Sequence, residues 1–136
     1  MLKRFTVSMD EKLLDDFDTY ISQRKYVNRS EAIRDLIRSI LVEKEWQADK
    51  AVMGVISLVY DHHQPKLQEK LTQIQHNYHH QVVSTTHVHM DHYNCLEVVI
   101  IRGKADSVVE LANDLRSLRG VRNCNLAMGT TGKNIR

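Results

Sequence analysis

The residue types of this chain change abruptly near its middle, across the charged stretch EKEWQADKAV at residues 43–52. All eight histidines, both cysteines and all five glycines lie after Lys50, whereas the first fifty residues balance ten acidic against ten basic side chains. A chain of 136 residues has room for one ordinary domain or two small ones. We therefore expect a domain over residues 1–48, a second domain over 52–130 and a flexible tail over 131–136.

The overall composition excludes several classes of protein. Hydrophobic residues make up 42% and charged residues 26%, which is typical of globular proteins, and no apolar run approaches the roughly 20 residues of a membrane span. Two cysteines cannot build a disulfide framework, and the first residues lack an apolar signal core, so we expect a cytoplasmic protein. The net charge of +2 argues against a strongly basic nucleic-acid binder. However, basic residues are concentrated at residues 24–38 and acidic residues at residues 10–18. A small net charge is therefore compatible with a surface that is basic on one side and acidic on another.

The strict alternation of polar and apolar residues from Arg4 to Met9 predicts a short strand. Its two faces carry the polar set Arg4, Thr6 and Ser8 and the apolar set Phe5, Val7 and Met9, of which we expect the apolar set to turn inward. One strand and two helices bury too little surface to be stable, and a lone strand leaves an unpaired edge. We therefore expect two copies to pair their strands antiparallel, so that the first half is an obligate dimer.

Two helices are expected after this strand. The first has acid in its first turn at Asp10 and ends near Lys25, and the second begins with Asn28 or Ser30 as its N-cap. The free N–H groups at the start of a helix attract anions, so Arg29, flanked by Asn28 and Ser30, can bind a phosphate there. A ribbon of two paired strands fits the DNA major groove, where Arg can bind guanine. The alternative is an ordinary solvated strand followed by a capped surface helix.

The second half alternates strand and helix signals in a recognisable order. We expect a strand at 53–60, a helix opened by Pro65 and running to about His79, strands at 81–90 and 95–101 around a turn, a helix from its cap Ser107 to about Leu118, a stop at Gly120 and a strand at 122–128. This β-α-β-β-α-β order is the ferredoxin-like pattern, an α+β fold with helices on one face of the sheet.

The histidines of the predicted hairpin suggest a metal site. His87 and His89 lie on one strand face, and Cys95 returns beside His89 after the turn. By alternation we expect the core to take the apolar residues of the return strand, Leu96, Val98 and Ile100. Cys95 and Glu97 would then share the open sheet face with the two histidines, opposite the helix that carries His76. Two imidazoles and a thiolate suit a borderline transition metal, with a fourth ligand from another subunit, although an exposed histidine pair beside an unrelated buried cysteine is the alternative.

The segments RFTVSMDEKLLDDFD and NRSEAIRDLIRS resemble ribbon-helix-helix transcription factors over about residues 1–45. In that family the paired strands enter the major groove, which implies that Arg4, Thr6 and Ser8 read the bases.

From Arg4 to about Met128 the chain is similar to the nickel-responsive regulator family (NikR), which joins a ribbon-helix-helix domain to a ferredoxin-like (ACT-type) metal-binding domain. The motifs that carry the resemblance are Gln75-His76, His87-Val88-His89 and Cys95-Leu96-Glu97. They imply one Ni(II) per subunit, bound square-planar by His76 of one subunit and by His87, His89 and Cys95 of another. Gln75 and Glu97 are then candidates to orient an imidazole, and the family's additional cation site matches Glu31 and Asp35.

The resemblance predicts a nickel-responsive transcriptional regulator, a homotetramer built as a dimer of dimers. We expect a repressor, for example of nickel uptake genes, that binds double-stranded operator DNA when Ni(II) is bound. Four protein ligands leave no open position for a substrate, so we expect no enzyme. The alternatives are a regulator that senses a small molecule and a protein for metal storage or delivery. The remaining histidines are expected to be solvated or weak secondary sites, and the second cysteine a core thiol: His62, His63, His79, His80, His92 and Cys124.

Overall fold

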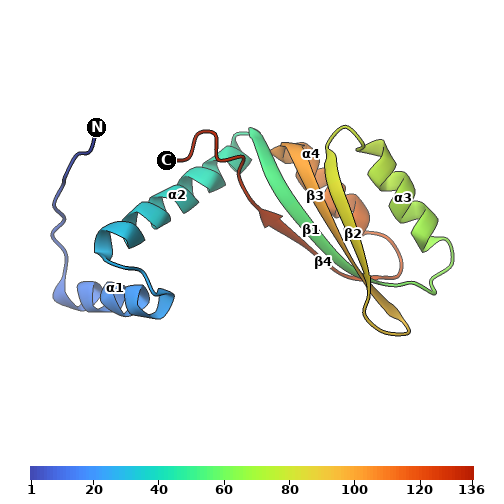
Figure 1. Ribbon diagram of the computed structural model, residues 1–136, viewed down its shortest axis with the longest axis horizontal. Helices are drawn as coiled ribbons and strands as arrows, with labels where there is room; N and C mark the ends of the chain where they lie inside the picture. The colour runs from blue at the N-terminus through green and yellow to red at the C-terminus, as the bar shows by residue number, and fades with distance from the viewer. The chain divides into compact units, whose positions relative to one another are not determined.

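The computed structural model describes residues 1–136 and divides them into two compact units, Met1–Ser39 and Ile40–Arg136. The helices and strands follow one another as α1 (Glu11–Arg24), α2 (Arg29–Gln47), β1 (Ala51–Asp61), α3 (Leu67–Asn77), β2 (Val82–His89), β3 (Asn94–Lys104), α4 (Ala105–Arg116) and β4 (Val121–Met128) (Figure 1). None of the helices combines the length and the apolar character that a membrane span requires.

Side chains near the helix ends explain where α1 and α2 begin and end. The Asp10 carboxylate accepts a hydrogen bond from the Lys12 backbone N–H at 3.0 Å, which caps α1. Lys25 ends that helix in a left-handed conformation, with φ of 60°. Asn28 caps α2, because its side-chain oxygen accepts a hydrogen bond from the Glu31 N–H at 2.8 Å. Of the two predicted caps, Asn28 is therefore the one that the structure uses.

Residues 1–10 form no hydrogen-bonded strand in the single chain, in contrast to the prediction. A strand needs a partner to complete its ladder of hydrogen bonds, and one chain offers none here. The apolar face is consequently not turned inward: Phe5 is 71% exposed and Val7 55%. In the whole unit Met1–Ser39, only Ala32 is buried.

The second unit has the predicted βαββαβ order, which confirms the α+β, ferredoxin-like fold. Its four strands form one antiparallel sheet in the order β2-β3-β1-β4, with β1 in contact with both β3 and β4 (Figure 1). Side chains of α3 and α4 meet those of the strands in one core, which includes Leu71, Leu111, Ile56 and Leu58. Helices therefore cover one face of the sheet.

Strand β3 presents the opposite face to the helices from the one predicted. Cys95, Glu97 and Val99 are buried under the helices, whereas Leu96 and Val98 are half-buried on the open face. Both faces of β3 carry apolar side chains, so the alternation alone gives no contrast from which to assign its sides.

Two predicted helix starts were wrong, the first by two residues and the second by three. Helix α3 begins at Leu67 rather than at Pro65, because Lys66 has φ of 63° and separates the proline from the helix. Helix α4 begins at Ala105, so Ser107 lies inside it and donates its hydroxyl to the Gln81 side chain at 2.7 Å. The N-terminal N–H groups of α4 are instead satisfied from a distant turn of the chain: Lys50 accepts from Ala105, and the Asp49 carboxylate accepts from Asp106.

The end of α2 is fixed to the edge of the sheet within the second unit. Trp46 is 6% exposed, and its indole N–H donates to the Gly129 carbonyl at 2.9 Å. Thr130 donates its hydroxyl to the Glu45 carboxylate at 2.7 Å. These contacts join α2 to the segment after β4.

Candidate metal centre and nucleic-acid interface

The β2–β3 hairpin brings the predicted metal ligands together. In the strand register His89 lies opposite Cys95 and His87 lies opposite Glu97, so all four side chains are on one face. That face is the one covered by the helices, and the prediction of the open face was wrong for all four. Val88 lies opposite Leu96, on the open side.

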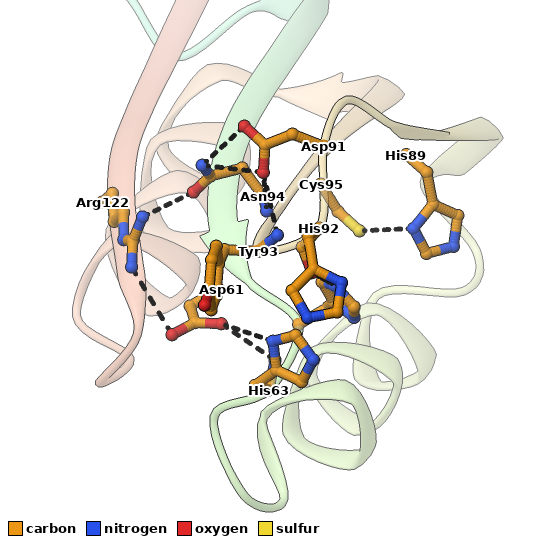
Figure 2. A network of polar contacts seen from close by, with 10 residues as sticks. Asp61, His63, His89, Asp91, His92, Tyr93, Asn94, Cys95 and Arg122 are labelled. Carbon is orange, nitrogen blue, oxygen red and sulfur yellow. Dashed lines mark hydrogen bonds and ion pairs between the residues drawn. The ribbon is translucent and has the colours of Figure 1, made fainter.

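Cys95 is the most deeply buried of these four side chains. Its Sγ lies 3.3 Å from His89 Nδ1 (Figure 2), and its side chain is fully buried. Burial raises the pKa of the Cys95 thiol, and the negative charges of Asp91 and Glu97 raise it further. Metal–nitrogen and metal–sulfur bonds of about 2.0 and 2.3 Å at a right angle place the two donor atoms about 3.1 Å apart. His89 and Cys95 are thus already spaced as neighbouring ligands of one metal ion.

His87 is oriented by two buried polar side chains. Its Nδ1 lies 3.2 Å from the Tyr60 hydroxyl and 3.6 Å from a Glu97 carboxylate oxygen. Glu97 is only 4% exposed and accepts a hydrogen bond from the Gln75 amide of α3 at 2.6 Å. Burial, with the nearby Glu97 and Cys95 charges, raises the pKa of Tyr60 to about 12, so its hydroxyl stays protonated. Glu97 thus lies beside the His87 imidazole, and Gln75 contacts Glu97.

Tyr60 itself was not predicted from the sequence. It lies opposite Cys95 in the β1–β3 register, and this pairing is the signal that identifies it once the register is known.

His76 does not join the other predicted ligands within the single chain. It is exposed on α3, where its ring stacks at 5.4 Å on that of His79. The predicted reason for this separation is wrong, because α3 covers the same sheet face that carries His87 and His89. The actual reason is helical geometry: Gln75 faces the sheet, and the next residue is turned about 100° away.

His62 lies close to His89 and Cys95, although it was predicted to be solvated or part of a weak secondary site. The donor atoms of His62, His89 and Cys95 all lie within 4.8 Å of one another. His62 follows β1, whose last residue Asp61 lies opposite Asn94 at the start of β3. The next residue therefore lies beside the hairpin turn, a position that periodicity alone does not reveal.

Polar contacts make the hairpin turn rigid (Figure 2). The Asp91 carboxylate accepts hydrogen bonds from the backbone N–H groups of Tyr93 and Asn94, both at 2.8 Å. These contacts lower the pKa of Asp91, and the Asn94 side chain contributes most. Arg122 of β4 donates to the Asn94 side-chain oxygen at 2.6 Å, which ties the turn to the opposite edge of the sheet.

The predicted DNA-contacting residues lie in the first unit. Arg4, Thr6 and Ser8 are all exposed, although no strand forms around them. At the start of α2, Ser30 is exposed and Arg29 makes two hydrogen bonds of 2.9 Å to the Asp18 carboxylate.

The predicted secondary cation site is engaged by other groups in the single chain. Glu31 pairs with Arg34 at 2.5 Å and with Arg38 at 3.2 Å, and Asp35 accepts a short hydrogen bond from the Tyr26 hydroxyl. A cation at Glu31 and Asp35 would have to compete with these partners.

Comparisons with known proteins connect both units to one family. A family model described as the NikR C-terminal nickel-binding domain matches residues 53–129, and a ribbon-helix-helix model of the CopG family matches residues 3–44. A protein of Desulfotalea psychrophila named as a nickel-responsive regulator is 62% identical over 135 residues, covering 99% of both chains. The chain belongs to the NikR family.

A second relative and a solved structure agree with this membership. A Solibacter usitatus protein, also named as a nickel-responsive regulator, is 52% identical over 136 residues, which is 99% of this chain and 98% of that protein. The structure of an uncharacterized Thermotoga maritima protein superposes with a TM-score of 0.52 over 57% of this chain and 96% of its own, at 13% identity, and it supports the fold alone.

NikR membership identifies the chain as a nickel-responsive regulator with a ribbon-helix-helix DNA-binding domain, and not as an enzyme. The sequence prediction of the family is thereby confirmed. The alternatives of a small-molecule sensor and of a metal-storage protein are not supported, because neither combines a nickel-binding domain with a DNA-binding domain.

Proposed function

We propose that this NikR protein is a cytoplasmic repressor, for example of nickel uptake genes, and that Ni(II) strengthens its binding to operator DNA. The observation that carries the proposal is the pair formed by His89 and Cys95, spaced as neighbouring metal ligands on a hairpin of a chain that also has a DNA-binding domain. The sequence ranges 1–48, 52–130 and 131–136 serve as DNA-binding domain, metal-binding domain and tail. The family matches at 3–44 and 53–129 lie within the first two ranges and support this division.

The proposed nickel site takes His87, His89 and Cys95 from one subunit and His76 from another, with one Ni(II) per subunit. A set of two to three imidazoles and one thiolate fits Ni(II), which accepts such ligands in a square plane. His76 is exposed and outside its own chain's cluster, which supports its donation to a neighbouring copy. Glu97, held by Gln75, would orient His87, as outer partners of ligating histidines do.

The proposed assembly is a tetramer made of two dimers. In the first unit the apolar side chains Phe5, Val7 and Leu13 are more than half exposed, which supports pairing with a second copy through the strand at residues 4–9. In the second unit the open sheet face carries apolar side chains such as Val55 and Val88, which are 39% and 43% exposed. A second copy that docks on this face would bury these side chains.

The proposed DNA contacts follow the dimer. Paired strands would present Arg4, Thr6 and Ser8 to the bases of the major groove. The start of α2, with Asn28, Arg29 and Ser30, would hold a backbone phosphate, for which Arg29 must exchange its Asp18 partner. This exchange of one anion for another makes the phosphate contact dependent on salt.

Nickel can raise operator affinity only if it binds the DNA-competent arrangement more tightly than the other arrangements. The coupling is reciprocal, so operator DNA must raise nickel affinity by the same factor.

The experiment that tests this function measures binding of a fluorescent DNA fragment from upstream of the chain's own gene cluster. We expect tight binding with Ni(II), weak binding with a chelator, and loss of the nickel effect in Cys95→Ala and His89→Ala. Cys124→Ala is the matched control, because Cys124 is also buried but lies on β4, outside the cluster. Binding that is independent of metal would refute nickel sensing, and unchanged nickel affinity in Cys95→Ala would refute the site.

A further inference from the structure

His62 adds a third donor to the pair His89 and Cys95 without help from another subunit. The donor atoms of these three side chains lie within 4.8 Å of one another. All three belong to one chain, whereas the nickel site proposed above is incomplete without the partner's histidine. The cluster therefore offers a metal ion two different sets of ligands.

The structure holds His62 in this position by backbone and ring contacts. Its backbone N–H donates to the Tyr93 carbonyl at 3.0 Å, and its Nε2 makes a short contact with the His92 carbonyl. Its ring meets that of His89 edge-on, with centroids 5.4 Å apart. The loop after β1 is thus tied to the hairpin turn, so His62 reaches the cluster from a fixed position.

His87 is not a member of this second donor set. Its Nδ1 is directed to Tyr60 and Glu97 instead. A single ion therefore has two alternatives: His62, or His87 together with the partner's histidine. The two alternatives share His89 and Cys95, so one chain can satisfy only one of them at a time.

We infer that His62, His89 and Cys95 form a second metal site within one chain, which takes a divalent transition-metal ion that prefers tetrahedral coordination. Three protein ligands of the nitrogen and sulfur type with a fourth position open to water are the pattern of tetrahedral Zn(II) sites. Where the proposed function holds, this site competes with the nickel site for His89 and Cys95. An ion bound there does not link two subunits, so it occupies the cluster without assembling the nickel set.

The test uses the full-length His76→Ala variant, which removes the ligand that only the nickel site needs. Co(II) is the probe, because its visible spectrum reports both tetrahedral geometry and a bond to thiolate. We expect His76→Ala to bind one Co(II) per chain with both signatures. In the double variant His62→Ala/His76→Ala, Co(II) affinity should fall at least about tenfold and the tetrahedral bands should disappear.

The matched control is His63→Ala/His76→Ala. His63 is adjacent in sequence and its ring lies 4.1 Å from that of His62, but it is outside the donor set and faces Asp61. This control should bind Co(II) as His76→Ala does. Equal Co(II) binding by His62→Ala/His76→Ala and by His76→Ala would overturn the inference, as would an octahedral spectrum without the thiolate band in His76→Ala.

The outcome separates this inference from the proposed function. Nickel-dependent operator binding is measured on the unaltered chain, where His76 is present. Loss of that dependence with the expected cobalt spectra would refute the proposed function and leave the second site standing. Nickel-dependent operator binding with equal Co(II) binding by the two His76 variants would do the reverse. Circular dichroism of each variant checks that the fold is intact.

Discussion

At the scale of single residues, Glu97 is the group on which the geometry of His87 depends. It is buried, it faces Nδ1 of His87 at 3.6 Å, and its other oxygen accepts from Gln75. A buried carboxylate is costly unless it is hydrogen-bonded, so its retention beside an imidazole indicates an orienting role.

We expect Glu97→Gln to weaken nickel binding about tenfold to 100-fold, because the amide carries no charge to stabilise the orientation of His87. Competition against a coloured chelator measures the affinity. Glu110→Gln, on the exposed face of α4, is the control and should leave nickel affinity unchanged. Equal affinities of the two variants would contradict the role of Glu97.

The ion pair between Asp18 and Arg29 gives a prediction on pH. The hydrogen bond from Arg29 lowers the pKa of the Asp18 carboxyl below its ordinary value of about 3.9. A lowered pKa means that the folded chain binds fewer protons, so the pair stabilises the fold at neutral pH and this contribution is lost as pH falls through the lowered pKa. We expect NMR titration of the Asp18 carboxyl carbon to have a midpoint below the ordinary value and Arg29→Ala to restore it. A midpoint that does not move in Arg29→Ala would show that the pair does not form in solution.

At the scale of elements, the packing of α4 on β1 depends on the absence of a side chain at Gly54. A Cβ added there would lie 2.8 Å from Val108 Cγ1 and 3.2 Å from Leu126 Cδ1. The first distance is too short for two carbon atoms and the second is tight, so a larger residue must displace the Val108 and Leu126 side chains.

We expect Gly54→Ala to lower the free energy of unfolding by about 1–3 kcal/mol. Urea denaturation at one fixed protein concentration measures this, because the stability of an oligomer depends on concentration. Ser84→Ala, exposed on β2, serves as the control and should stay within about 0.5 kcal/mol of the unaltered chain. A Gly54→Ala variant as stable as the control would mean that α4 and Leu126 rearrange without cost.

The order of the elements could be predicted from the sequence, but the sides of β3 could not. Turn residues and apolar runs mark where strands and helices alternate, and the predicted ligand spacing of His87, His89 and Cys95 survives in the hairpin. The side of β3 that faces the helices could not be predicted, because Leu96 and Val98 are as apolar as the buried Val99. Glu97 also resembles a solvated residue until its partner on α3 is known.

The positions of Tyr60 and His62 depend on long-range contacts that sequence patterns do not encode. Both are brought to the cluster by the pairing of β1 with β3, which joins residues more than thirty positions apart. The strand at residues 4–9 does not form for a related reason, since a single chain offers it no partner strand.

At the scale of the whole molecule, the two units differ in how much each would gain from contact with a second copy of the chain. The first unit buries only Ala32 and needs a partner to gain a core, whereas the second has a full core and an additional apolar face. Within the proposed assembly, we therefore expect the dimer through the first unit to be more persistent than the tetramer, which a single substitution should separate.

We expect Val55→Lys to convert the proposed tetramer into a dimer, because a charge in the middle of the open sheet face cannot be buried between two copies. Analytical ultracentrifugation measures the mass. Glu110→Lys, on exposed α4, introduces the same side chain away from that face and should leave the tetramer intact. A tetrameric Val55→Lys would exclude the open face as the interface.

The hairpin that joins His89 to Cys95 has a consequence for the order of events during synthesis. Only five residues separate the two donors, and Asp91 closes the turn through the N–H groups of Tyr93 and Asn94. A hairpin closes in about 1–10 μs, whereas a ribosome adds only about 5–20 residues per second. The two donors can therefore meet before β4 has joined the sheet, and thus before a second subunit can supply its histidine.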